Sequence, residues 1–317
     1  MEPSRDTEVS AEEKADHVPG DPAASRWRQA ARRHQFAWRE SHGWQPGEIT
    51  TPREKRKSGN RVADRCVDGV ACNFLSRHIT HAVEHRLDHP QPHQTLDDYR
   101  LWHDLLSSMP MCFNLFGPLW NDPTRAAKAV AGWFPDLAQP GAPVTIHFEW
   151  SPGRKDPAWL GDRTAFDCMI EIGTGEGRAI IGIATKYHEY PMATPRAKTP
   201  KVPSRYRDVT SNAHLFIDAD QPQQIWGKKV EQVWRDHLLA LACKQHDAGP
   251  ANVRYLLVAP AANPAWAPLV DEYRAMLQAG ARSTIEYRTI ESLLAAAGDV
   301  LPHAAEFRAR YLDVDLD

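Results

Sequence analysis

Two charged residues, Asp167 and Lys186, lie in segments that are otherwise apolar. Burying either charge alone would cost several kcal/mol, so we expect the two side chains to share one site. A carboxylate can bind a divalent metal ion, and a lysine can stabilise a phosphate group. The pair therefore indicates phosphate chemistry, although both side chains could instead face solvent on a half-exposed sheet.

A glycine-rich segment, residues 173–177, separates the two apolar runs and predicts a turn between two strands. In a strand, every second residue faces the same side, which groups Asp167 with Met169 and Glu171, and Lys186 with Gly182 and Ala184. If the turn closes a simple antiparallel hairpin, the numbers of paired residues add up to about 350. Asp167 then lies opposite residue 183 or 184.

Ala184, two residues before Lys186, faces the same side of the predicted strand and carries no charge. Glu149, at the end of a predicted strand, is a candidate for an additional carboxylate, with an exposed strand-end acid as the alternative. Four more residues are candidates for supporting the site: Tyr187 and Glu189 after the lysine, and Gln232 and Arg235 at helical spacing i, i+3.

A proline-containing basic loop follows the lysine, where a groove wall could contact a phosphate backbone. Its cationic residues are Arg196, Lys198, Lys201, Arg205 and Arg207. The formal net charge of the chain is -3, so nucleic-acid binding must come from such local patches.

The glycine-rich segment also has a second interpretation. Glu171 to Gly177 resembles the E-x-G-x-G-x-G loop that holds the cofactor in S-adenosylmethionine-dependent methyltransferases, where a helix follows directly. Here the next residues, 178–185, are isoleucine-rich and predict a strand. The glycines are therefore interpreted as turn residues, and the methyltransferase stays as an alternative.

The 317 residues, 42% of them hydrophobic, are enough for one large domain or two smaller ones. The five cysteines form no C-x-x-C pair, which is typical of reduced thiols. No apolar run is long enough for a membrane span, and we expect a cytoplasmic protein.

Local patterns predict a central mixed α/β sheet flanked by helices. Strands are expected at 144–150, 164–172, 178–187 and 253–258, and helices at 60–87, 95–109, 223–244, 268–279 and 290–297. Residues 1–25 are expected to be a disordered acidic tail, 26–140 a basic segment with an N-terminal helical region, and 141–317 the core with C-terminal helices.

Several motifs in this order resemble the PD-(D/E)xK nuclease superfamily, in particular a bacterial restriction-endonuclease-like group with A-F-D and G-I-E-x-K-Y-x-E strands. Ala165-Phe166-Asp167 matches the first strand, and the segment from Gly182 to Glu189 matches the second. Residues 105–119 are similar to the segment before the core, and 232–239 to the core helix. The resemblance covers about residues 60 to 260 and implies a restriction-endonuclease-like core.

By this resemblance, Asp167 would be a metal ligand, Glu149 an accessory acid and metal ligand, and Lys186 would orient the water or stabilise the phosphate. The family's Glu would complete the metal shell where this chain has Ala184. Two explanations stay open: a naturally degenerate site, or a deliberate inactivating substitution, which the well-kept neighbouring residues favour.

We therefore expect a Mg²⁺- or Mn²⁺-dependent DNA endonuclease of bacterial restriction or antiphage defence, inactive or impaired because of Ala184. DNA is the expected partner, with a homodimer or a defence-system protein as further possibilities. A non-catalytic nucleic-acid-binding module is the other alternative.

Overall fold

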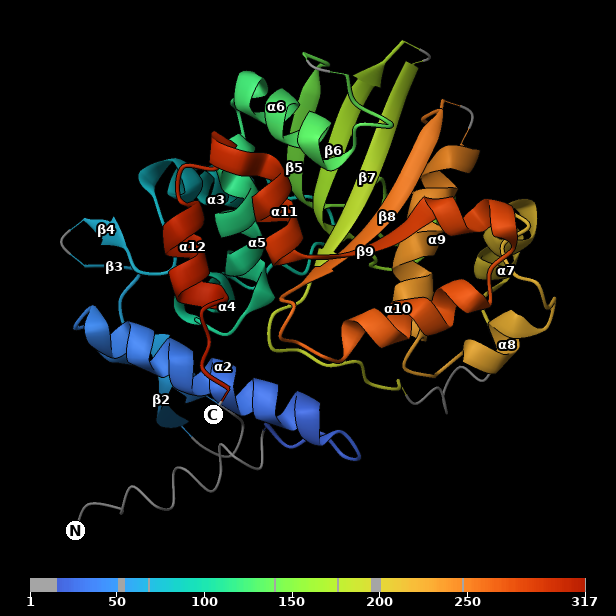
Figure 1. Ribbon diagram of the computed structural model, residues 1–317. Helices are drawn as coiled ribbons and strands as arrows, with labels where there is room; N and C mark the ends of the chain where they lie inside the picture. The colour runs from blue at the N-terminus through green and yellow to red at the C-terminus, as the bar shows by residue number, and fades with distance from the viewer. Residues whose placement is uncertain are drawn as a thin grey trace.

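A five-stranded mixed sheet forms the centre of the protein (Figure 1). The computed structural model describes residues 16–50, 55–67, 69–139, 141–175, 177–194, 201–246 and 248–316. The strands lie in the order β5 (Val144–Trp150), β6 (Phe166–Thr174), β7 (Gly177–Thr185), β8 (Asn252–Ala259) and β9 (Ile285–Thr289). The first three are antiparallel, while β8 and β9 continue parallel to β7. The predicted mixed α/β sheet flanked by helices is confirmed.

Helices cover both faces of the sheet (Figure 1). One layer contains α3 (Arg77–Asp88), α5 (Ser108–Phe116), α6 (Pro123–Trp133), α11 (Ile290–Ala297) and α12 (Ala304–Tyr311), and the other contains α7 (Ser204–Asn212), α9 (Glu231–Gln245) and α10 (Trp266–Ala275). Side chains of β7 alternate between the two cores. Ile181 and Ile183 pack with the first layer, whereas Ile180 and Ala184 pack with the second. Ala184 therefore faces α9.

The N-terminal region is built around one long helix, α2 (Pro22–Ser41), which lies beside α12. Four short strands and a helix follow: β1 (Pro46–Thr50), β2 (Lys55–Val62), β3 (Cys66–Val67), β4 (Val70–Ala71) and α4 (Asp98–His103). Residues 1–15 of the predicted tail lie outside the described residues. Its last residues are folded, because Asp21 caps α2 and the buried Asp16 accepts a 2.6 Å hydrogen bond from Arg32. Residues 16–25 therefore do not belong to a disordered tail.

The predicted helix over 60–87 is wrong in its first half. Residues up to Val62 belong to β2, and the helix α3 begins only after its N-cap Ser76. This stretch is extended because Val62 of β2 pairs with Pro46 of β1, and because β3 and β4 pair with each other between residues 66 and 71. Helical spacing of apolar residues alone could not reveal these partners.

Two other predicted helices are each divided. The helix over 95–109 is replaced by α4, capped by Asp97, and by α5, capped by Ser107. The helix over 223–244 is replaced by α8 (Gln221–Ile225) and α9. The break between them contains Gly227, whose positive φ of 80° favours glycine, and whose N–H donates to the Glu231 carboxylate at 2.6 Å. Short 3-10 turns, η1 (Gly117–Leu119), η2 (Ala279–Thr284) and η3 (Gly298–Val300), connect other elements.

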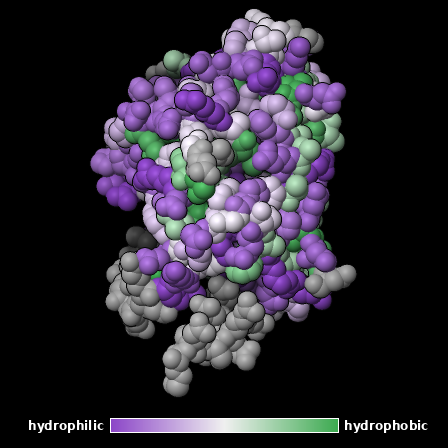
Figure 2. All heavy atoms as spheres, turned by 90° about the vertical axis from the view of Figure 1, so that its left-hand side faces the viewer, coloured by the Kyte–Doolittle hydropathy of each residue, from purple (hydrophilic) through white to green (hydrophobic). Residues whose placement is uncertain are grey.

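The face that carries the N-terminal helices is mostly hydrophilic. Figure 2 shows apolar residues on it as scattered spots among polar ones. The apolar sides of these helices therefore pack inward, as the first core requires. Within the described part of the chain, none of the helices has the length and apolarity needed to cross a bilayer.

Candidate active site

The β6–β7 hairpin brings Asp167 next to Ala184. Its register pairs Cys168 with Ile183, so the next step along the ladder places Asp167 opposite Ala184, as predicted. The glycine-rich segment closes the hairpin at the other end of the sheet, where Thr174 pairs with Gly177. A strand and not a helix follows these glycines, so the segment lacks the strand-loop-helix form of a methyltransferase cofactor loop.

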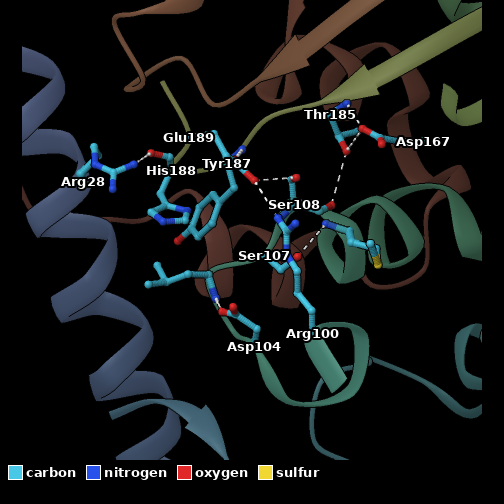
Figure 3. Close-up of polar contacts among 12 residues, drawn as sticks. Arg28, Arg100, Asp104, Ser107, Ser108, Asp167, Thr185, Tyr187, His188 and Glu189 are labelled. Atoms are coloured by element: carbon cyan, nitrogen blue, oxygen red, sulfur yellow. Dashed lines mark hydrogen bonds and ion pairs between the residues drawn. The ribbon is translucent and has the colours of Figure 1, made fainter. Parts of the chain in front are cut away.

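One oxygen of the Asp167 carboxylate is fixed by Thr185 (Figure 3). The backbone N–H of Thr185 donates to Oδ2 at an N···O distance of 2.7 Å, and its hydroxyl lies 3.0 Å from the same oxygen. The hydroxyl also lies 3.4 Å from the backbone oxygen of Ser108, at the start of α5. Among the described residues, no hydrogen bond to Oδ1 occurs. Asp167 is thus oriented through one oxygen, and the other remains available to a ligand.

Lys186 follows directly after β7. Its backbone N–H donates to the carbonyl of Val258 at 2.8 Å, which continues the ladder to β8 by one residue. The Nζ atom lies 5.4 Å from the ring centroid of Trp266, a distance at which a cation is attracted to the ring face. The indole N–H of Trp266 donates to the backbone oxygen of Glu189 at 2.9 Å. Trp266 therefore connects the lysine to the chain that follows it.

Tyr187 and Glu189 belong to the segment that follows Lys186, and hydrogen bonds fix this segment in place (Figure 3). The Glu189 carboxylate accepts from the Ser108 hydroxyl and from the Tyr187 N–H, both at 2.7 Å. Burial by itself would raise the pKa of Glu189, but His188, Lys186 and these hydrogen bonds hold it below its usual value. The hydroxyl of the buried Tyr187, whose pKa burial raises, accepts from a glutamine side chain of α2 at 2.9 Å.

A cavity of about 280 Å³ opens between the hairpin and α9. Six of the predicted site residues line it: Asp167, Ala184, Lys186, Glu149, Gln232 and Arg235. Asp162, Arg163 and Asp236 add further charged groups. Residues from β5, β6, β7 and α9 therefore meet around one polar cavity. Tyr187 and Glu189 lie outside its lining.

Asp236, on α9, was missed by the sequence reasoning. Its side chain is buried beside the cavity, and the Tyr255 hydroxyl lies 3.5 Å from Oδ2. Burial raises the pKa of Asp236 to about 6, although Arg235 and Lys186 act in the opposite direction. The sequence did offer one indication of a buried acid: Asp236 follows Arg235 on the predicted helix and lies between apolar residues that pack on the sheet.

Glu149 has an unusual backbone conformation at the cavity. Its φ of 47° is in the left-handed region, and it lies between the paired residues Phe148 and Trp150 of β5. Arg154 donates both to its backbone oxygen at 2.8 Å and to its carboxylate at 3.0 Å. Burial and the neighbouring Asp167 raise the pKa of Glu149, while Arg154 lowers it. One carboxylate oxygen is therefore already engaged by an arginine.

A comparison with protein-family models now identifies the fold: the PD-(D/E)XK nuclease superfamily model matches residues 22–313. The chain belongs to the PD-(D/E)XK nuclease superfamily. No curated protein and no solved structure gives a significant match. PD-(D/E)XK nucleases generally use divalent metal ions such as Mg²⁺.

The donor set of this PD-(D/E)XK protein fits such an ion in its chemistry. Mg²⁺ prefers oxygen ligands and is often held by one or two carboxylates together with substrate phosphates. Asp167 offers a free oxygen, and Glu149 and Asp236 line the same cavity. Within the described ranges, no three His, Cys, Asp or Glu side chains form a preassembled metal site. The site is therefore compatible with an ion held by few protein ligands.

The basic loop is described only in part. Arg196 and Lys198 lie outside the described residues, and Lys201 is exposed just before α7. Arg205 donates from Nε to the backbone oxygen of Trp159 at 2.6 Å, and Arg207 donates to that of Val202 at 3.0 Å. These two guanidinium groups thus hold nearby backbone, a role that sequence spacing could not indicate.

Proposed function

We propose that this protein is a divalent-metal-dependent nuclease that hydrolyses DNA phosphodiester bonds at the cavity beside Asp167 and Lys186. The observation that carries the proposal is the shared cavity itself: a chain of the PD-(D/E)XK superfamily places a carboxylate and a lysine from adjacent strand ends around one polar space. A nuclease of this superfamily acts on DNA.

In this proposal Asp167 would hold the ion through Oδ1, since Thr185 holds Oδ2. A bound divalent ion would polarise a phosphoryl oxygen and generate the attacking hydroxide from water. Lys186 donates to the phosphate and stabilises the negative charge that develops on it. Glu149 is an accessory acid, and Arg235 with Gln232 contacts the substrate from α9.

The decisive experiment is cleavage of supercoiled plasmid DNA with Mg²⁺ or Mn²⁺. We expect weak native activity, because Ala184 removes one carboxylate ligand, and a gain in the Ala184→Glu variant. Asp167→Asn and Lys186→Met should lose activity in both backgrounds. Glu171→Gln is the matched control, because Glu171 lies on the same strand and pairs with Arg178 outside the cavity. Unchanged nicking by Ala184→Glu and Asp167→Asn would refute the proposal.

The restriction or defence role, cleavage of both strands by a homodimer, and DNA contacts from Lys201, Arg205 and Arg207 are further parts of the proposal. Phage plaque counts with and without Ala184→Glu test the first, and sedimentation with and without a DNA duplex tests the second.

One observation favours a second candidate, a non-catalytic DNA-binding module: a methyl group occupies the position of the expected acid at Ala184. Such a module would bind DNA with salt-dependent affinity and remain inert after Ala184→Glu.

A further inference from the structure

The face of the sheet that carries Ala184 is covered by α9. Ala184 is 5% exposed, packs in the same core as this helix, and pairs with Leu257 of β8 on its other side. Ala184 lines the cavity with only a methyl group. A longer acidic side chain at this position would extend further toward α9, and that part of the cavity is open.

Asp236 projects from α9 into this same cavity. Among the described residues, three carboxylates are more than nine-tenths buried: Asp16, Glu231 and Asp236, which are 1%, 2% and 6% exposed. Asp16 accepts a hydrogen bond from Arg32 at 2.6 Å, and Glu231 accepts one from the backbone N–H of Gly227 at 2.6 Å. Asp236 is different, because its nearest donor is the Tyr255 hydroxyl at 3.5 Å.

Arg235 compensates for this only in part, because it meets Asp236 as a long ion pair and not through a hydrogen bond. The Nε atom of Arg235 lies 3.8 Å from Asp236 Oδ1, beyond hydrogen-bonding distance, and is itself a buried donor without a hydrogen-bond partner. Lys186 lines the cavity but forms no ion pair within 4.0 Å with Asp236 in the described part of the chain. A buried carboxylate is costly unless a cation meets it.

We propose that Asp236 supplies, from α9, the second carboxylate ligand that the chain lacks at position 184. The inference rests on the proposed function and deepens it: the ion would be held by Asp167 Oδ1 and Asp236, two carboxylates from different elements, with the substrate phosphate completing its oxygen ligands. The small side chain of Ala184 leaves the room that this arrangement needs.

The test is Mn²⁺ binding to the full-length protein by calorimetry without DNA. We expect Asp236→Asn to weaken binding at least about tenfold, the scale on which a lost ligand or ligand partner acts. Glu231→Gln, which removes a buried carboxylate of the same helix outside the cavity, should leave the affinity unchanged. Ala184→Glu combined with Asp236→Asn should restore binding to near the native level.

Native-like affinity in Asp236→Asn, with binding lost in Asp167→Asn, would overturn the inference and leave the nuclease proposal intact. If neither the native protein nor Ala184→Glu binds Mn²⁺ or cleaves DNA, both proposals fail. Thermal unfolding checks that each variant is folded. If Asp236→Asn does not fold, titration of the native protein with diamagnetic Mg²⁺ decides: carboxylate carbon shifts of both Asp167 and Asp236 that change at the same Mg²⁺ concentration support the inference, and a change at Asp167 alone refutes it.

Discussion

Replacing Thr185 by valine tests whether the residue between Ala184 and Lys186 positions the proposed metal ligand. Valine has nearly the same shape as threonine, so at this position, which is 0% exposed, the variant removes the hydroxyl and leaves the side-chain volume almost unchanged. It removes the hydroxyl 3.0 Å from Asp167 Oδ2 but keeps the backbone N–H at 2.7 Å. The change is thus restricted to one of the two donors.

A hydrogen bond to a charged group contributes about 1.5–3 kcal/mol. At about 1.4 kcal/mol for each factor of ten, its full loss at the metal site corresponds to about 10- to 100-fold in affinity. The same range is typical for residues that orient metal ligands. We therefore expect Thr185→Val to weaken Mn²⁺ binding by about 10- to 100-fold.

Calorimetric titration of Mn²⁺ without DNA measures this directly, and Thr185→Ser, which keeps the hydroxyl, is the matched control. Serine should retain binding within about threefold of native, a margin below the loss expected for a ligand-orienting residue. If valine and serine both bind like the native protein, the backbone N–H alone orients Asp167 and the reasoning is wrong.

Three further predictions concern stability. Burial lowers the pKa of His237 from 6.5 to about 3, so as the pH falls the unfolded state binds a proton before the folded state does. The free energy of unfolding, measured by urea titration, should therefore drop by about 2 kcal/mol between pH 6.5 and 5. His237→Gln should make the free energy of unfolding less dependent on pH in this range. Glu189→Gln, which weakens the acceptor for Ser108 and the N–H of Tyr187, should cost about 1–3 kcal/mol; unaltered denaturation midpoints would contradict this. Gly182→Ala should cost about 1–3 kcal/mol, because its Cβ would lie 2.3 Å from the Phe166 ring, and Phe166→Leu should recover part of the loss in thermal melts.

The sequence alone determined the central hairpin and its register. A glycine-rich turn and period-two alternation are local properties, and they placed Asp167 opposite Ala184 correctly. The strand at 144–150 was predicted with its observed ends, because β-branched and aromatic residues bounded by Gly, Pro or Asp are also a local signal. The helix over 60–87 was not, because its first half is held extended by the pairing of β2 with β1 and of β3 with β4, which no local spacing reports.

Only the tertiary structure decided what surrounds these residues. The hydroxyl of Thr185 and the carboxylate of Asp236 reach the site through contacts between a strand and helices that are distant in sequence. Arg205, expected to face a phosphate backbone, instead binds the carbonyl of Trp159, 46 positions away. Residue type and alternation fix which side of a strand a group occupies, whereas the packing of helices on that side determines which groups meet it.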